Sequence, residues 1–177
     1  MLVNFLFKNC RSFYQENIFS MQAVKDTELR EINTFTVDSK LMPKDENEFI
    51  KSAVIFGGNA SGKSNVLKAL AYMKNVLLMS ASQFPIVAAN ETFAFYENAQ
   101  NEESTYEVEI IHNASYYKYG FTLLKGIVKS EWLERRKERL TPVFKRTDND
   151  LEITGLSKQA TRLINISKNT LFLSVGN

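Results

Sequence analysis

The stretch GGNASGKS, Gly57 to Ser64, directly follows the apolar run AVIF at residues 53–56. It matches the pattern G-x-x-x-x-G-K-[ST] at every fixed position, and the glycines of that pattern let backbone N–H groups turn inward around phosphate oxygens. AVIF is typical of a short strand buried on both faces. Apolar residues then recur at helical spacing from about residue 62 to 80. Strand, glycine loop and helix together predict a phosphate-binding loop, because a helix N-terminus adds unpaired donors and a positive dipole end.

Each residue of the loop has an expected role in holding a nucleotide. Lys63 is expected to reach the β- and γ-phosphates, and the Ser64 hydroxyl is expected to ligate Mg²⁺. The backbone of the preceding residues would cradle the phosphates. The predicted nucleotide-binding residues of the loop are Gly57, Gly58, Asn59, Ala60, Ser61, Gly62, Lys63, Ser64 and Asn65.

The composition is that of an ordinary globular chain of 177 residues, 44% hydrophobic and 24% charged, which suits one domain or a large part of one. The net charge of +2, from 22 basic and 20 acidic residues, is too even to predict nucleic-acid binding. One cysteine and one histidine exclude an internal disulfide and argue against a Cys/His metal site. Without a signal peptide or a membrane-length apolar run, the sequence predicts a cytoplasmic protein with no membrane partner.

Apolar patterning predicts an α+β chain that is rich in strands on both sides of the helix. Strands are expected at 2–7, 17–24 and 32–37, and again as a hairpin at 105–111 and 117–124. The charged ERRKER core (134–139) is expected as a solvated helix turn between the extended flanks IVKSEWL and PVFKR. DLEIT (150–154), after TDND, is expected as part of another hairpin. The predicted organisation is one partial domain, 1–177, made of a β-lobe (1–37), a surface loop (38–50), the loop strand and helix (51–80), an antiparallel β-region (90–155) and a C-terminal helical segment (157–177).

The loop interior also resembles a known class. GxNASGKS followed by Asn65 is similar to the loops of ABC-type ATPases, especially those of the SMC, RecF and OLD class. The N-terminus LVNFLFKNCRSF resembles the opening strand of that class and its K-N-x-R-S-[FH] turn. The resemblance implies ATP and Mg²⁺ as cofactors, and it implies that Asn9, Arg11 and Ser12 form a second tier of nucleotide contacts.

A second resemblance covers the β-rich half. Tyr119-Gly120-Phe121 and Ile127 to Leu133 resemble the F/Y-x-Y-G-[FY] and I-V-x-E-x-L strands of AAA ATPase-like proteins from bacterial abortive-infection and phage-defence systems, which are relatives of OLD and RecF. This implies a P-loop NTPase fold of the ABC ATPase head type. It further implies a homodimer of heads in the full-length protein and a nuclease or other effector as partner.

Several parts of a hydrolytic site are absent from the sequence. The class needs four apolar residues followed by Asp-Glu, for Mg²⁺ and for the attacking water. Phe35 to Asp38 comes nearest, but it lies before the loop and lacks the second acid. His112 falls in an expected hairpin turn, and LSVGN (173–177) resembles the signature L-S-G-G-[EQ] only superficially. We therefore expect the N-terminal part of an ATPase head that binds ATP with little or no turnover, and we assign no catalytic residue.

Other functions stay open at this stage. A stand-alone phosphotransferase or kinase would use the basic cluster Arg135, Arg136, Lys137 and Arg139 as a lid, although kinases alternate helices and strands more regularly. A nucleotide-stabilised interaction module is the other alternative. A GTPase would need D-x-x-G and N-K-x-D, and neither occurs. The basic cluster also offers a contact for nucleic acid, but its interleaved glutamates favour a solvated face.

Overall fold

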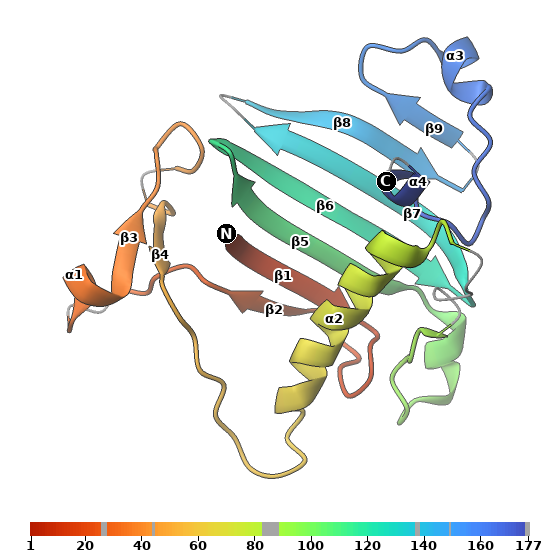
Figure 1. Cartoon of the computed structure of the whole chain (residues 1–177). Helices are drawn as coiled ribbons and strands as arrows, with labels where there is room; N and C mark the ends of the chain where they lie inside the picture. Colours follow the sequence, from red (N-terminus) through yellow and green to blue (C-terminus); the bar gives the residue numbers. More distant parts are fainter. Residues whose placement is uncertain (26–27, 44, 83–88, 137–138, 149, 176–177) are drawn as a thin grey trace.

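One antiparallel sheet of seven strands, in the order β2-β1-β5-β6-β7-β8-β9, organises the chain (Figure 1). The computed structural model describes residues 1–177 except 26–27, 44, 83–88, 137–138, 149 and 176–177. The strands of this sheet are β1 (Leu2–Lys8), β2 (Asn17–Ser20), β5 (Ser104–His112), β6 (Ser115–Leu124), β7 (Ile127–Arg136), β8 (Leu140–Thr147) and β9 (Asp150–Ile153). A separate hairpin is formed by β3 (Thr34–Thr36) and β4 (Glu48–Ile50).

The helix α2 (Lys63–Met79) is the longest helix among the described residues and lies across one face of the sheet (Figure 1). The shorter helices are α1 (Arg30–Asn33), the 3₁₀ helix η2 (Glu97–Asn101), α3 (Lys158–Arg162) and α4 (Phe172–Val175). Because side chains alternate across a strand, one face of the sheet is apolar, and α2 buries Ala69, Met73 and Val76 against it. The sheet side of this core includes Phe5, Phe7, Tyr106, Phe121 and Leu123.

The expected strands at 2–7, 105–111 and 117–124 and the expected helix at 62–80 are confirmed within one or two residues. The division into two β-regions is wrong. β1 pairs with β5 from Leu2 opposite Ile110 to Lys8 opposite Thr105, so the N-terminal strands and the later strands form one sheet. Of the expected strand at 17–24, only residues 17–20 form β2. Of the expected strand at 32–37, residues 34–36 form β3, which pairs with β4 instead of joining this sheet, and residues 32–33 belong to α1.

The AVIF segment corrects the sequence prediction most clearly. Residues 52–58 form neither helix nor strand, and Val54 and Phe56 are 72% and 87% exposed. Within the described part of the chain, residues 53–56 also make no backbone hydrogen bond. Apolar, β-branched composition favours a strand, but a strand requires a neighbour to pair with. None of the described segments lies in that position.

Three further expectations differ from the structure. ERRKER contains no helix turn where it is described, because β7 continues through Arg136; residues 137–138 lie outside the described residues. The expected surface loop at 38–50 is only partly a loop, since residues 48–50 form β4 and Leu41 and Met42 are buried with Phe49. The C-terminal helical segment consists of two short helices, α3 and α4, separated by extended chain.

The packing of Trp132 explains why strand β6 has glycine at residue 120, between Tyr119 and Phe121. Gly120 lies opposite both Glu107 on β5 and Trp132 on β7. The Trp132 indole crosses Gly120 and donates from Nε1 to Oε2 of Glu107 at 2.9 Å. A Cβ atom at residue 120 would lie 2.4 Å from the ring and 2.9 Å from the Tyr106 carbonyl oxygen. Only glycine leaves room for this crossing.

Glu131 on β7 anchors the tail segment, which we define as residues 167–174. Its side chain is fully buried, and its carboxylate accepts hydrogen bonds from Phe172 N (2.6 Å), Leu173 N (3.1 Å) and the Tyr119 hydroxyl (3.0 Å). Burial raises the pKa of Glu131, while these donors and Arg146 act in the opposite direction. Arg146, which is 3% exposed and lies 3.9 Å away, donates to the carbonyls of Thr170 and Ser167.

The tail segment also holds the far end of α2. Leu171 N donates to the Ser80 hydroxyl, the Thr170 hydroxyl donates to the Ser80 carbonyl, and Ala81 N donates to the Ser174 hydroxyl, each at 3.1 Å. Leu171 is completely buried in the same core as α2. The helix that starts at the glycine loop is therefore fixed to the sheet at its C-terminal end.

Candidate functional site: the glycine loop and the turn beside it

The glycine loop ends directly on α2. Gly62 has φ 91°, a left-handed conformation that favours glycine, and it is the residue that precedes the helix. A Cβ atom there would lie 3.0 Å from the Ser12 hydroxyl oxygen and 3.4 Å from the Phe13 ring. Both the backbone conformation and the close approach of residues 12 and 13 therefore require glycine at this point.

Lys63 points back into the loop rather than into solvent. Its Nζ donates to the carbonyls of Gly57 at 2.8 Å and Gly58 at 2.6 Å. Ser61 N donates to the Gly58 carbonyl at 3.3 Å, which closes the turn. The ammonium group is thus held at the centre of the loop, where an incoming phosphate would replace two neutral carbonyls with charged oxygens.

A cavity of about 310 Å³ lies at this loop and is lined by Ala60, Ser61, Gly62, Lys63, Ser64 and Asn65. Residues 57–61 and Ser64 are exposed to solvent. The first N–H groups of a helix have no partner within the helix and point outward along its axis. Exposed N–H donors, one lysine and one hydroxyl are the donor set that suits a phosphate chain with a magnesium ion.

The turn between β1 and β2 lies against the loop. Cys10 and Phe13 exchange two backbone hydrogen bonds of 2.8 Å, so Arg11 and Ser12 form the tip of a tight turn. The Ser12 hydroxyl accepts a hydrogen bond from Nδ2 of Asn65 at 3.0 Å. The structure therefore brings Ser12 and Asn65, 53 positions apart in the sequence, into direct contact at the start of α2.

Arg11 and Asn9 are engaged elsewhere. Arg11 pairs with Glu91 at 2.8 Å, and its N–H donates to the Glu91 carbonyl at the same distance. Asn9 is fully buried; its Nδ2 donates to the carbonyls of Ala99 and Glu102, and its Oδ1 accepts from Phe93 N. These three hydrogen bonds join Asn9 to the segment 93–102, and they use both N–H groups of its amide. A contact between Asn9 and a nucleotide stays a prediction.

Other predicted groups lie apart from the loop. His112 is exposed at the end of β5, and Ser174 of the LSVGN segment is buried beside α2 with its hydroxyl bonded to Ala81 N. Among the described residues, no group of three or more His, Cys, Asp and Glu side chains is arranged to hold a metal ion. Ser64 is exposed at the start of α2, and its role as a ligand of Mg²⁺ stays a prediction.

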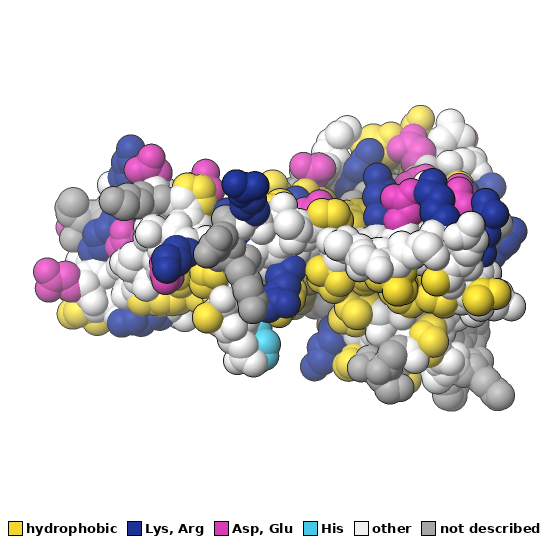
Figure 2. Space-filling view, turned by 90° about the horizontal axis from the view of Figure 1, so that it is seen from above, with side chains coloured by type: hydrophobic (Ala, Val, Ile, Leu, Met, Phe, Trp, Pro, Cys, Tyr) yellow, Lys and Arg dark blue, Asp and Glu magenta, His cyan; other side chains and the backbone are white. Residues whose placement is uncertain are grey.

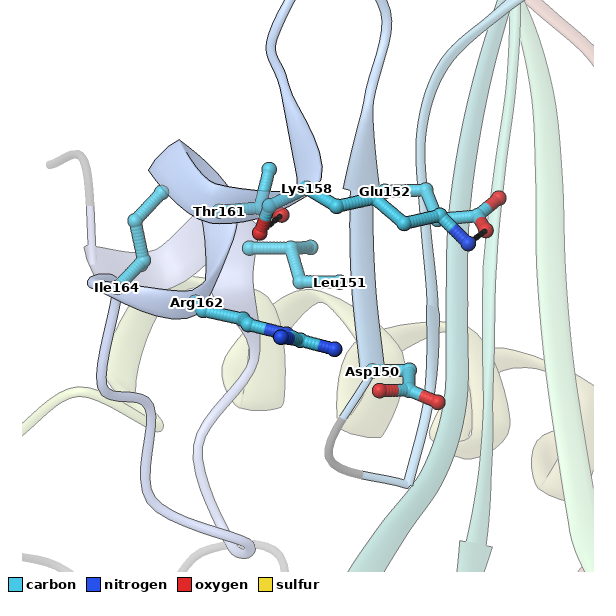
Figure 3. Close-up of a pocket in the computed structure, with 7 residues that line it drawn as sticks. All are labelled: Asp150, Leu151, Glu152, Lys158, Thr161, Arg162 and Ile164. Atoms are coloured by element: carbon cyan, nitrogen blue, oxygen red, sulfur yellow. Dashed lines mark hydrogen bonds and ion pairs between the residues drawn. The ribbon is translucent and has the colours of Figure 1, made fainter.

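A second cavity, of about 250 Å³, lies between β9 and α3 (Figure 3). Lys158 and Glu152 pair at 3.9 Å on one side of it, while Arg162 extends towards Asp150 on the other (Figure 3). Two acidic and two basic side chains leave no net charge to select a ligand. Figure 1 shows α3 and β9 at the opposite end of the molecule from the start of α2.

Sequence reasoning missed the segment that packs on the turn. Glu91 and Phe93 hold Arg11 and Asn9, and Phe13 lies over Gly62. The turn pattern named Arg11 and Ser12, but it carried no signal for their partners some 80 residues later. An aromatic-rich stretch, FAFY at 93–96, was the only available hint.

Comparison with known proteins agrees with the class that this loop and helix define, the P-loop ATPase-like proteins. Residues 52–163 match the family described as "AAA domain, putative AbiEii toxin, Type IV TA system". The match covers more than half of the chain, and the chain belongs to this AAA-domain family. The family implies a P-loop NTPase fold, here with a mostly antiparallel sheet, and its members generally bind ATP with Mg²⁺.

No curated protein matches the sequence. None of the described helices has the length and apolar character needed to cross a membrane.

Proposed function

We propose that this chain is the ATP-binding portion of an ABC-type ATPase head of the RecF/OLD kind. The observation that carries the proposal is the contact between the glycine loop and the first turn of the chain, where Asn65 donates to Ser12 and Phe13 lies over Gly62. A turn from the opening strand that closes on a phosphate loop is the arrangement expected from the resemblance to that class. Gly57 to Asn65 would hold the phosphates, and Ser64 would ligate Mg²⁺.

The exposed apolar surface beside the loop supports the view that the head is partial. Val54 and Phe56 are exposed without strand partners among the described residues, and α2 exposes Leu67 (63%) near the loop and Leu78 (55%) near its C-terminal end. Soluble proteins rarely leave such surface uncovered. We propose that a further strand layer, carrying the Asp-Glu pair required for hydrolysis, covers it. On this proposal 1–177 forms one partial domain, and turnover requires residues outside this sequence.

The partners follow from the same proposal. Two heads that face each other would clamp two ATP molecules, so that binding favours the closed dimer. The AbiEii wording of the family description favours a role in bacterial defence, in which the head regulates a nuclease or another effector protein.

The alternatives have less support. A kinase lid is disfavoured because Arg135 and Arg136 lie over the rings of Tyr117 and Tyr116 at 5.7 and 5.3 Å, and Arg136 also donates to the Leu41 carbonyl. Arg135 and Arg136 are thus strand side chains packed on aromatic rings, and Arg139 is an exposed residue between β7 and β8. A nucleotide-stabilised interaction module remains the second candidate, favoured by the exposed apolar surface beside the loop.

Nucleic acid is not favoured as a partner by the surface charge. In the view from above, Lys and Arg side chains are interspersed with Asp and Glu side chains (Figure 2). Some of the basic side chains are also paired, as Lys118 is with Glu107 at 2.8 Å. A surface that binds duplex nucleic acid would instead have Lys and Arg side chains clustered together with few acidic side chains among them.

A titration of the purified chain tests the proposed function. ATP and ADP should bind in the presence of Mg²⁺, and Mg²⁺ should strengthen the binding of ATP, while the rate of phosphate release stays at the level of the buffer. Isothermal calorimetry gives the affinities, and a phosphate-release assay gives the turnover. Steady GTP hydrolysis, or transfer of phosphate to an acceptor, would contradict the assignment.

A further inference from the structure

An aromatic cluster lies where the segment that leads into η2 meets the turn after β1. Phe93 lies 5.7 Å from Phe95 and 5.6 Å from Tyr14, and Tyr14 lies 5.1 Å from Tyr96, measured between ring centroids. Phe95 is 87% exposed and Tyr96 is 42% exposed. The cluster is therefore partly buried at one end, at Phe93 and Tyr14, and presents two aromatic rings to solvent at the other.

The backbone that carries these rings is firmly attached to the protein. Asn90 accepts from the Tyr106 hydroxyl and donates to the Ser104 hydroxyl, at 2.7 and 2.8 Å. One residue later, Glu91 is bonded to Arg11 through both backbone and side chain. The exposed rings thus extend from backbone that is hydrogen-bonded to the rest of the protein, and their exposure is a property of the fold at this position.

The cluster and the glycine loop flank the same turn. On one side, Ser12 and Phe13 contact Asn65 and Gly62 of the loop. On the other, Tyr14 contacts Phe93 and Tyr96. Figure 1 shows the turn after β1 lying between the start of α2 and the segment that leads into η2. A ligand whose phosphates occupy the loop can extend across the turn towards these rings.

We propose that Phe95 and Tyr96 form the stacking surface for the base of the nucleotide whose phosphates the glycine loop holds. The inference rests on the proposed function and adds a base subsite to it. Aromatic rings stack on the flat face of any base, and removal of one such ring commonly weakens binding roughly 5- to 150-fold. A protein partner is less favoured as occupant, because the exposed surface is two rings joined to a phosphate site rather than a broad apolar face.

The test compares ligands with and without a base. Phe95→Ala and Tyr96→Ala are titrated with Mg-ATP and with inorganic tripolyphosphate. Each variant should bind ATP roughly 5- to 150-fold more weakly than the wild type and should bind tripolyphosphate as the wild type does. Leu163→Ala is the matched control, because Leu163 is equally exposed (85%) but lies beside α3. It should change neither affinity.

The outcomes separate the two proposals. Unchanged ATP affinity in both aromatic variants overturns the base subsite and leaves the phosphate loop intact. An equal loss for ATP and tripolyphosphate also overturns it, since the rings would then act through the fold. Failure of the wild type to bind either ligand overturns the proposed function and the base subsite with it. Ring-current shifts of the adenine protons, seen with wild type and absent with Phe95→Ala, would support stacking independently.

Discussion

Replacing Glu131 by glutamine should lower the free energy of unfolding by about 3–5 kcal/mol, the cost of leaving one member of a buried ion pair alone. Glu131 and Arg146 are 0% and 3% exposed. A carboxamide has one acceptor oxygen instead of two, so its NH₂ group would face the N–H of Phe172 or Leu173. Arg146 would keep its charge in the interior without its counter-ion. Chemical denaturation followed by circular dichroism measures the change.

Glu134→Gln is the matched control for this variant, because Glu134 lies on the same strand and is only partly buried. Its stability should stay within about 0.5 kcal/mol of the wild type. Hydrogen exchange adds a local measurement, since the amides of Phe172 and Leu173 should lose protection in Glu131→Gln and keep it in Glu134→Gln. Equal stability of the two variants would show that the carboxylate does not anchor the tail segment.

Replacing Gly120 by alanine should destabilise the fold by about 1–3 kcal/mol, the usual cost of adding a methyl group to a filled space. The new Cβ would lie 2.4 Å from the Trp132 ring, which is held in place by its hydrogen bond to Glu107. The ring must therefore move or give up that bond. The free energy of unfolding of Gly120→Ala, measured by denaturant titration, gives the effect.

A double-mutant cycle isolates the contact between Gly120 and Trp132. Trp132→Leu removes the ring, and in that background Gly120→Ala should cost less, with the residual cost coming from the Tyr106 carbonyl at 2.9 Å. An equal cost in the two backgrounds would refute the account of why this strand contains glycine.

The sequence predicted local elements well and long-range partners poorly. Helix α2 and the hairpin β5–β6 follow from periodicity and turn residues inside one stretch of chain. The pairing of β1 with β5 joins residues more than 90 positions apart, and no local pattern encodes it. AVIF is a case in which local composition misled the prediction. Its residues favour a strand, but a strand needs a neighbour to pair with, and the described residues do not provide one.

The candidate site divides in the same way. The glycine loop could be predicted as a candidate site residue by residue from its spacing, and its binding of phosphate stays a prediction. The turn motif predicted the same role, a nucleotide contact, for Asn9 and for Ser12. The structure buries Asn9 and places Ser12 against Asn65. The residue types were right for polar contacts, but burial decides which of them remains available to a ligand.

The most direct test of phosphate binding by the glycine loop is the affinity for Mg-ATP of two lysine variants. Lys63→Ala removes the ammonium group held at the loop, and Lys68→Ala removes an exposed lysine of the same charge just over one turn further along α2. The account predicts that Lys63→Ala loses at least about 100-fold in affinity, as expected for a charge-assisted contact of roughly 3 kcal/mol, while Lys68→Ala binds as the wild type does. ATP affinity retained by Lys63→Ala, or lost equally in both variants, would contradict it.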